Sequence, residues 1–194
     1  MAPAPVRSEG PNLVPRTKVY TMRKPTTSNG CGKVNVVLTP DGSTFSLLMN
    51  DFTATTDNKF VRKSCDVTVP VDVVPGISIG VFRFDYRGYA SVPNVPKAYT
   101  QFNAEYFFAG ARGPTFSQTF APGYDDDYSL SNRVAGSFMT WSPCGGSTIL
   151  RFTASVAAYK GGNATDDADP YIGLDSVDVK AEDGIQISFF VRKC

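Results

Sequence analysis

Residues 60–69 read Phe-Val-Arg-Lys-Ser-Cys-Asp-Val-Thr-Val, and from residue 64 onward polar side chains alternate with apolar ones. Because successive side chains of a β-strand point to opposite faces of the sheet, this period of two predicts a strand with one buried and one solvated face. No segment of the chain keeps a helical period over three turns. We therefore expect an all-β fold.

Further strand-like runs flank this stretch. Residues 33–39 and 43–50 enclose Pro40-Asp41-Gly42, where Pro and Gly favour a tight turn, so we expect a hairpin. The apolar face of residues 77–86 changes phase after Val81, which predicts a β-bulge there. Short strands separated by Gly, Pro, Asp and Asn predict an antiparallel, jelly-roll-like β-sandwich over residues 30–194, preceded by an extended arm of residues 1–29.

The chain has four cysteines and no histidine, and no two cysteines form a Cys-x-x-Cys pair. This spacing argues against a zinc site and favours two disulfides, which indicate a secreted protein, extracellular or at the cell surface. Chain order favours Cys31 with Cys65 and Cys144 with Cys194, one of three possible pairings. No apolar run approaches the roughly 18 residues that a membrane span needs.

Charge and composition exclude several function classes. The formal net charge of +1 argues against nucleic acid as a partner. Without histidine, Ser-His-Asp and Cys-His catalysis and all histidine metal sites are excluded. A carboxylate pair for glycoside hydrolysis remains open, but nothing in the spacing of the acids selects one. We therefore expect a protein that is not an enzyme and has no cofactor or metal.

Several short motifs, in this order along the chain, resemble the family called domain of unknown function 4360. The resemblance spans residues 30–194. It implies a secreted β-sandwich with conserved cysteines and no established activity, so it assigns no catalytic residue. The motifs are Gly30-Cys31, Arg62-Lys63-Ser64-Cys65, Asp85-Tyr86-Arg87-Gly88-Tyr89, Trp141-Ser142-Pro143-Cys144-Gly145, Asp175-Ser176 and Arg192-Lys193-Cys194.

The run Asp125-Asp126-Asp127, flanked by Tyr124 and Tyr128, is the main candidate for a ligand site. Carboxylates bind calcium through oxygen, although this run lacks the alternating spacing and distal glutamate of a helical calcium loop. Tyrosine rings stack on sugar faces, and neighbouring carboxylates accept hydrogen bonds from sugar hydroxyl groups, so carbohydrate is the second possible ligand. Two further interpretations are a docking site for the chain's own basic segment and solvated turn residues.

One glycosylation sequon is present, Asn163-Ala164-Thr165, in a Gly-rich polar segment. We expect Asn163 to carry a glycan if the source organism glycosylates its secreted proteins.

The arm of residues 1–29 holds five basic side chains and one acidic one, whereas the rest of the chain holds 14 basic and 17 acidic ones. Its strand-forming stretch can add to a sheet edge of its own body or of a neighbour, and head-to-tail addition that does not close forms a fibre. We therefore predict a structural protein that self-assembles into an extracellular fibre or surface layer. The alternative is a carbohydrate-binding or cell-wall module whose partner is a polysaccharide. The expected donor side chains are Leu13, Val19, Tyr20 and Met22.

Overall fold

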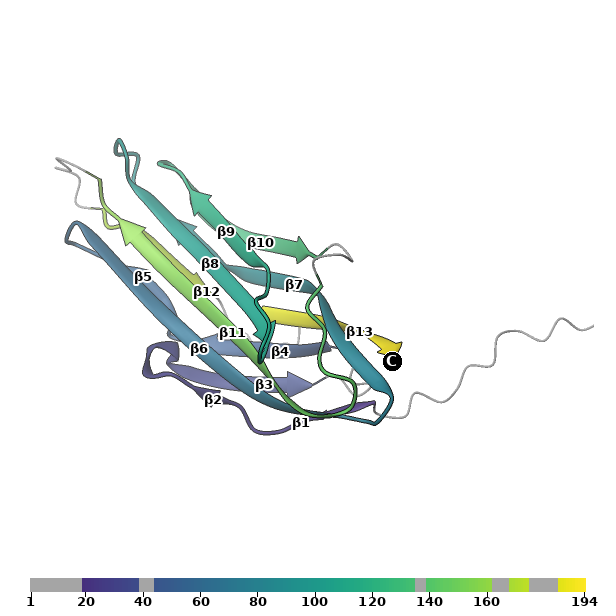
Figure 1. Ribbon diagram of the computed structural model, residues 1–194. Helices are drawn as coiled ribbons and strands as arrows, with labels where there is room; N and C mark the ends of the chain where they lie inside the picture. The colour runs from purple at the N-terminus through teal and green to yellow at the C-terminus, as the bar shows by residue number, and fades with distance from the viewer. Residues whose placement is uncertain (1–18, 39–43, 135–138, 162–167, 175–184) are drawn as a thin grey trace, which may run out of the picture.

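The computed structural model describes residues 19–38, 44–134, 139–161, 168–174 and 185–194. These residues form two antiparallel sheets that lie face to face, with one short 3-10 helix before the third strand (Figure 1). The expected β-sandwich is therefore confirmed. The elements are β1 (Tyr20–Met22), β2 (Thr26–Thr27), η1 (Asn29–Cys31), β3 (Lys33–Leu38), β4 (Thr44–Asn50), β5 (Thr53–Thr55), β6 (Phe60–Val73), β7 (Ile77–Ser91), β8 (Tyr99–Phe108), β9 (Thr115–Phe120), β10 (Asp125–Arg133), β11 (Gly146–Tyr159), β12 (Tyr171–Leu174) and β13 (Ile185–Lys193).

The first sheet, sheet A, has the strand order β1-β6-β11-β8-β9, and β2 also pairs with β6. Its long strands β6 and β11 pair over their whole lengths, from Phe60 opposite Tyr159 to Val73 opposite Gly146. Figure 1 shows this sheet as the front layer. The strand predicted at residues 60–69 is the first part of β6, so the stretch that set the fold class lies near the centre of sheet A.

The second sheet, sheet B, is arranged around β7, which is 15 residues long. On one side β7 pairs with β10, and on the other it pairs with β13 along its first part and with β12 along its last part. Strands β4 and β3 continue the sheet beyond β13, and β5 continues it beyond β12. Strand β10 therefore forms an edge of sheet B among the described residues.

Two local predictions for sheet B are confirmed. Strands β3 and β4 pair antiparallel from Lys33 opposite Asn50, as expected for a hairpin, while its turn residues lie outside the described residues. The register between β13 and β7 shifts after Ser188, which faces Arg83, because Phe189 faces Val81. Phe82 is the additional residue, so the phase change in the sequence corresponds to a bulge.

The largest buried side chains of the core are aromatic rings from both sheets. Phe84 of β7 and Tyr106 of β8 lie with ring centroids 3.6 Å apart, and Phe152 of β11 lies 6.1 Å from Phe84. All three rings are buried. Such pairs contribute beyond the area that they bury, so these contacts join sheet A to sheet B across the interior.

Both disulfides have the pairing favoured by chain order. Cys31 of η1 is bonded to Cys65 of β6, and both are fully buried. Cys144 is bonded to Cys194, and both of these residues are exposed. The first bond fixes the start of the sandwich to sheet A, and the second fixes the end of β13 to the segment before β11.

The described part of the arm pairs with its own body. Tyr20–Met22 run antiparallel to Val71–Val73 of β6, and the buried Tyr20 ring lies 5.4 Å from that of Phe189. Val19 accepts a hydrogen bond from the Val74 amide at 3.0 Å. Three of the four expected donor residues therefore complete an edge of sheet A in their own chain. Leu13 lies outside the described residues.

Candidate functional site

The three predicted acidic ligands lie at the start of β10, where strand alternation separates them. Asp125 faces Ser91 and Asp127 faces Tyr89, so both point to the outer face of sheet B, while Asp126 points the other way. Within the described ranges, no group of three or more acidic or cysteine side chains is arranged to hold a metal ion. The calcium interpretation of this run is therefore corrected: its carboxylates do not converge on one point.

The prediction that Tyr128 contacts a ligand is also corrected by its position. Its side chain is 4% exposed and packs on the inner face of sheet B, with its ring 5.0 Å from that of Phe120. The hydroxyl group donates a hydrogen bond to the Gly173 carbonyl at 2.9 Å. Tyr128 thus belongs to the core and is not available to an external ligand.

Tyr124, the other flanking tyrosine, is half-buried at the turn before β10. Its ring lies 4.7 Å from that of Phe120, and its hydroxyl group donates to the Asp127 carbonyl at 3.2 Å. Partial burial, with the nearby negative charges of Asp126 and Asp127, raises the pKa of Tyr124. Its contacts hold the turn in place.

Two tyrosines that sequence reasoning did not select lie beside the acids instead. Tyr89 of β7 is exposed, and its hydroxyl group donates a hydrogen bond to the Asp125 carboxylate. This bond raises the pKa of Tyr89 and, together with a hydrogen bond from Ser91, lowers the pKa of Asp125. The Tyr171 ring of β12 lies 6.0 Å from the Tyr89 ring. We call Tyr89, Tyr171, Asp125 and Asp127 the Tyr89 patch.

A larger candidate surface covers the outer face of sheet A. Along β8 every second residue is buried, so the side chains between them point outward in a row. The pairing registers of β6, β11, β8 and β9 place further polar side chains beside this row. We call this surface the sheet A platform, and its residues are Phe60, Arg62, Ser64, Asp66, Tyr99, Gln101, Asn103, Glu105, Phe107, Ser117, Thr119, Arg151, Thr153, Tyr159 and the buried Ser155.

Hydrogen bonds between strands fix the middle of the platform. The Gln101 side-chain amide donates to the Thr119 hydroxyl at 3.1 Å and accepts from Asn103 at 3.2 Å. Arg62 donates to the Ser155 hydroxyl at 2.9 Å. Nearby, the Thr153 hydroxyl donates to the Asp66 carboxylate at 2.7 Å. Donors and acceptors are therefore held in set positions across the four strands.

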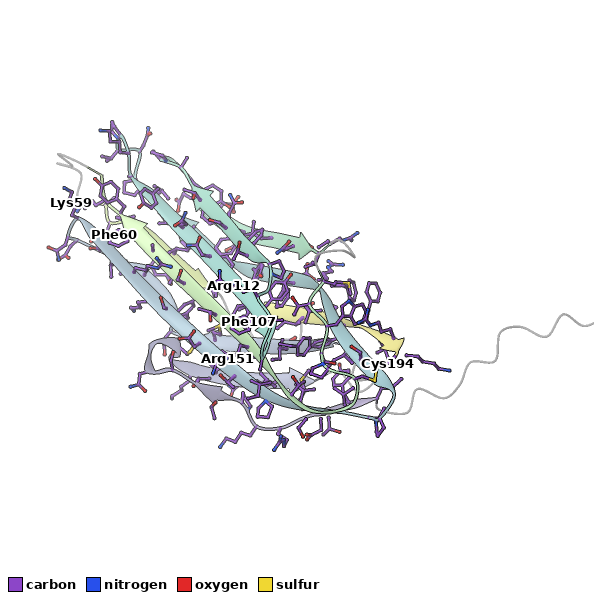
Figure 2. All side chains as sticks on the ribbon, in the orientation of Figure 1. Lys59, Phe60, Phe107, Arg112, Arg151 and Cys194 are labelled. Carbon is purple, nitrogen blue, oxygen red and sulfur yellow. A yellow bond between two sulfur atoms is a disulfide. The ribbon has the colours of Figure 1, made fainter. Side chains whose placement is uncertain are left out.

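Aromatic side chains lie at both ends of the platform. At one end Phe60 is 52% exposed, and the rings of Tyr99 and Tyr159 lie side by side with centroids 5.3 Å apart. At the other end Phe107 of β8 faces Arg151 of β11. Figure 2 shows Phe60 at one end of this face and Phe107, Arg151 and Arg112 toward the other. From the strand rise, Tyr99 and Phe107 are about 27 Å apart, so the outward row of β8 is long.

A hollow of about 430 Å³ lies near the second end of the platform, between residues 111–114 and 139–141. Trp141, which lines it, packs against Gly80, where an added Cβ atom would lie 2.8 Å from the ring. The Arg192 guanidinium lies 4.0 Å from the Trp141 ring centroid, a cation–π contact. Trp141 is thus engaged by its own chain, so we do not place a ligand in this hollow.

The alternation of residues 99–107 already indicates the platform, although the short motifs do not include it. Residues 99–107 alternate Tyr, Gln, Asn, Glu and Phe with buried neighbours, so one side of the predicted strand is polar with an aromatic at each end. The partner strands follow only from the pairing register. The sequon at Asn163 lies outside the described residues.

The sequence profile of the family described as domain of unknown function (DUF4360) matches residues 26–194. The chain belongs to this family. The resemblance noted from the cysteine and Asp-Tyr-Arg motifs is therefore confirmed. Membership of this DUF4360 family assigns no activity to the chain.

One curated relative of this DUF4360 chain is an uncharacterized secreted protein of Arthroderma benhamiae, with 28% identity over 161 residues. The match covers 80% of the present chain and 65% of the relative, so the chain spans just under two thirds of the relative's length. Secretion, expected from the cysteines, is confirmed by this relative and agrees with the two disulfides. Among the described residues, no helix is long and apolar enough to span a membrane.

One solved structure with a similar arrangement is that of TmCBM61 in complex with β-1,4-galactotriose. The alignment covers 91% of this DUF4360 chain and 89% of the other, at 12% identity and a TM-score of 0.33. At this score the likeness supports no argument about fold or function.

Proposed function

We propose that this secreted protein is a non-catalytic polysaccharide-binding module that contacts its ligand through the sheet A platform. The observation that carries the proposal is the composition of that face: ordered amide, hydroxyl and charged groups across four strands, with the exposed Phe60 at one end and the half-buried Phe107 at the other. Together these groups match the chemistry of a sugar chain.

The two kinds of side chain contribute different interactions. A sugar ring has an apolar face that packs on an aromatic ring, and the exposed Phe60 and the half-buried Tyr99 and Tyr159 lie together for such a contact. The hydroxyl groups of a sugar donate and accept hydrogen bonds, as Gln101 and Asn103 also do. Because these amides are already held by neighbours, little conformational entropy is lost when a ligand binds.

The shape of the platform favours a polymer over a small ligand. Small ligands usually bind in enclosed pockets, whereas this surface is the outer face of a sheet about 27 Å long. The position of the arm also makes polysaccharide binding a better supported function than fibre formation, because Tyr20–Met22 pair within their own chain. Fibre formation through the arm remains a prediction.

The proposal is tested by sedimentation with insoluble cellulose, chitin, β-1,3-glucan and β-1,4-galactan. We expect the protein to be retained on at least one of them and Phe60→Ala or Tyr99→Ala to weaken that retention. Phe190→Ala is the matched control, because Phe190 is also 52% exposed but lies on sheet B. The proposal would be contradicted if the protein bound none of the four polymers, or if Phe60→Ala and Phe190→Ala reduced retention equally.

A further inference from the structure

We propose that the Tyr89 patch is a second polysaccharide site, so that one molecule joins two polysaccharide chains on opposite sides of the sandwich. This inference rests on the proposed function, since it assumes that sheet A binds one chain. The second site lies on the outer face of sheet B and shares no residue with the platform.

The two rings of the patch lie on the surface of β7 and β12. Tyr89 is 36% exposed, and its ring is inclined at 46° to that of Tyr171. Tyr89 faces Gly173 in the register, and a Cβ atom added at Gly173 would lie 2.9 Å from the Tyr171 hydroxyl oxygen. The absence of a side chain at Gly173 therefore lets the Tyr171 ring lie across the strand. Tyr171 faces Ser91 in the register and therefore lies on the same outer face as Tyr89, where a sugar ring can stack on it.

The two acids of the patch differ in their hydrogen bonds: Asp125 already accepts one from Tyr89, whereas the Asp127 carboxylate is available to a ligand. Asp125 holds the Tyr89 hydroxyl group, which fixes the ring before any ligand binds. Asp127 faces Tyr89 in the register, and within the described part of the chain its carboxylate has no hydrogen bond or ion pair. That exposed carboxylate is placed to accept a hydrogen bond from a hydroxyl group of a sugar stacked on the rings.

The composition of the patch favours a sugar over a protein partner. A stable protein interface has a buried apolar centre that is depleted in acidic residues. Here two tyrosines lie beside two exposed aspartates, and the outward neighbours of Tyr89 along β7 are the polar Ser91 and the exposed Arg87. Aromatic rings beside fixed oxygen acceptors repeat the chemistry of the sheet A platform.

The placement of the two sites determines what binding at both does. They lie on the outer faces of two sheets that pack about 10 Å apart, so they point in opposite directions. Two sites add avidity on one ligand only when geometry allows both to engage it at once. Because one stiff polymer cannot lie on both faces, occupation of both sites joins separate chains.

The test measures cross-linking and binding separately. The probes are soluble hydroxyethyl cellulose, glycol chitin, β-1,3-glucan and β-1,4-galactan of high molecular weight. Light scattering reports joined chains, and retardation in gels that contain the polymer reports binding. We expect the wild-type protein, monomeric without polymer, to be retarded and to increase scattering. Tyr89→Ala/Tyr171→Ala and Phe60→Ala/Tyr99→Ala should each remain retarded but lose the scattering increase.

The outcomes distinguish the two proposals. No retardation of the wild-type protein in any polymer contradicts the proposed function itself. Retardation without a scattering increase, or unchanged scattering for the Tyr89→Ala/Tyr171→Ala variant, overturns the second site and leaves the first intact. If thermal melting shows that the double variant does not fold, Asp127→Asn replaces it. That change keeps both rings and removes the charge of the unused acceptor, so it should reduce the scattering increase, and unchanged scattering would likewise overturn the second site.

Discussion

The Tyr128 hydroxyl group of β10 donates a hydrogen bond to the Gly173 carbonyl of β12, although β7 lies between these two strands. The side chain reaches across because Gly88 of β7, which faces Tyr128, has no side chain. One contact thus connects three strands at the end of sheet B that carries the Tyr89 patch. The contact of Tyr128 on the inner face therefore holds together the three strands that carry the Tyr89 patch on their outer face.

We predict that Gly88→Ala destabilises the fold. The added Cβ atom would lie 2.1 Å from the Gly173 carbonyl oxygen and 2.5 Å from the Tyr128 hydroxyl oxygen, so the backbone must move. Overpacking of this kind costs about 1–3 kcal/mol, and each kcal/mol is worth about 2–4 °C of Tm in a chain of this size. Calorimetry measures the shift in Tm, and Ser129→Ala, at an exposed residue of β10, is the control. Equal Tm values for the two variants would contradict the prediction.

We predict that the two disulfides respond differently to reductant under native conditions. Cys144 and Cys194 are exposed, whereas Cys31 and Cys65 are fully buried and become accessible only when the structure opens. Each 1.4 kcal/mol of opening cost slows attack about tenfold, so Cys144–Cys194 should be reduced first. Alkylation with mass mapping over time measures the order, and a denatured sample supplies the control. Simultaneous reduction in the native protein would show that burial gives no protection.

We predict that Tyr89→Phe raises the pKa of Asp125 toward its ordinary value of 3.8. The native carboxyl pKa is lowered mainly by the Tyr89 hydroxyl group and then by Ser91, so loss of the first donor removes only part of the effect. The stabilisation from this hydrogen bond is therefore complete above pH 3.8 and is lost as the pH falls through the lower native pKa. An NMR titration of the Asp125 carboxyl carbon measures the midpoint. No upward shift in the variant would show that the Tyr89 bond does not act on Asp125.

We predict that a version beginning at Ser28 is less stable than the full chain and more prone to aggregate. It lacks Tyr20–Met22, which cover the β6 edge at Val71–Val73, and exposed strand edges recruit other chains. Loss of the buried Tyr20 ring alone is worth about 3 kcal/mol. Chemical denaturation and electron microscopy of both versions test this. Fibres formed by the full chain and absent from the Ser28 version would instead support assembly through the arm.

The sequence predicted the fold well because its signals are local. The period of two in β6, the hairpin of β3 and β4 and the phase change at Phe82 each depend on neighbouring residues. The sequence analysis was less successful for the candidate site, because a sheet surface is assembled from strands far apart in the chain. Asp125 is adjacent to Tyr124 in sequence, yet its hydrogen-bond partner is Tyr89, 36 residues earlier. Period alone does not give the register that brings such residues together.

The same limitation explains the two corrected assignments. Tyr124 and Tyr128 lie on either side of three acids in sequence, but alternation directs Tyr128 inward, and a neighbouring strand determines how deeply it is buried. The acidic run looked like one cluster only because its residues are consecutive. In a strand, consecutive residues are the ones that point away from each other.

The Cys144–Cys194 bond has a mechanical consequence for the sandwich. A force applied to the chain at Cys194 would otherwise peel β13 from β7 one hydrogen bond at a time, starting at Lys193 opposite Ile77. The disulfide passes that load directly to Cys144, just before the 14-residue strand β11. Tension is then carried by the long, centrally paired strand of sheet A, where many hydrogen bonds must break together. Separation of β13 from β7 one hydrogen bond at a time is thereby prevented.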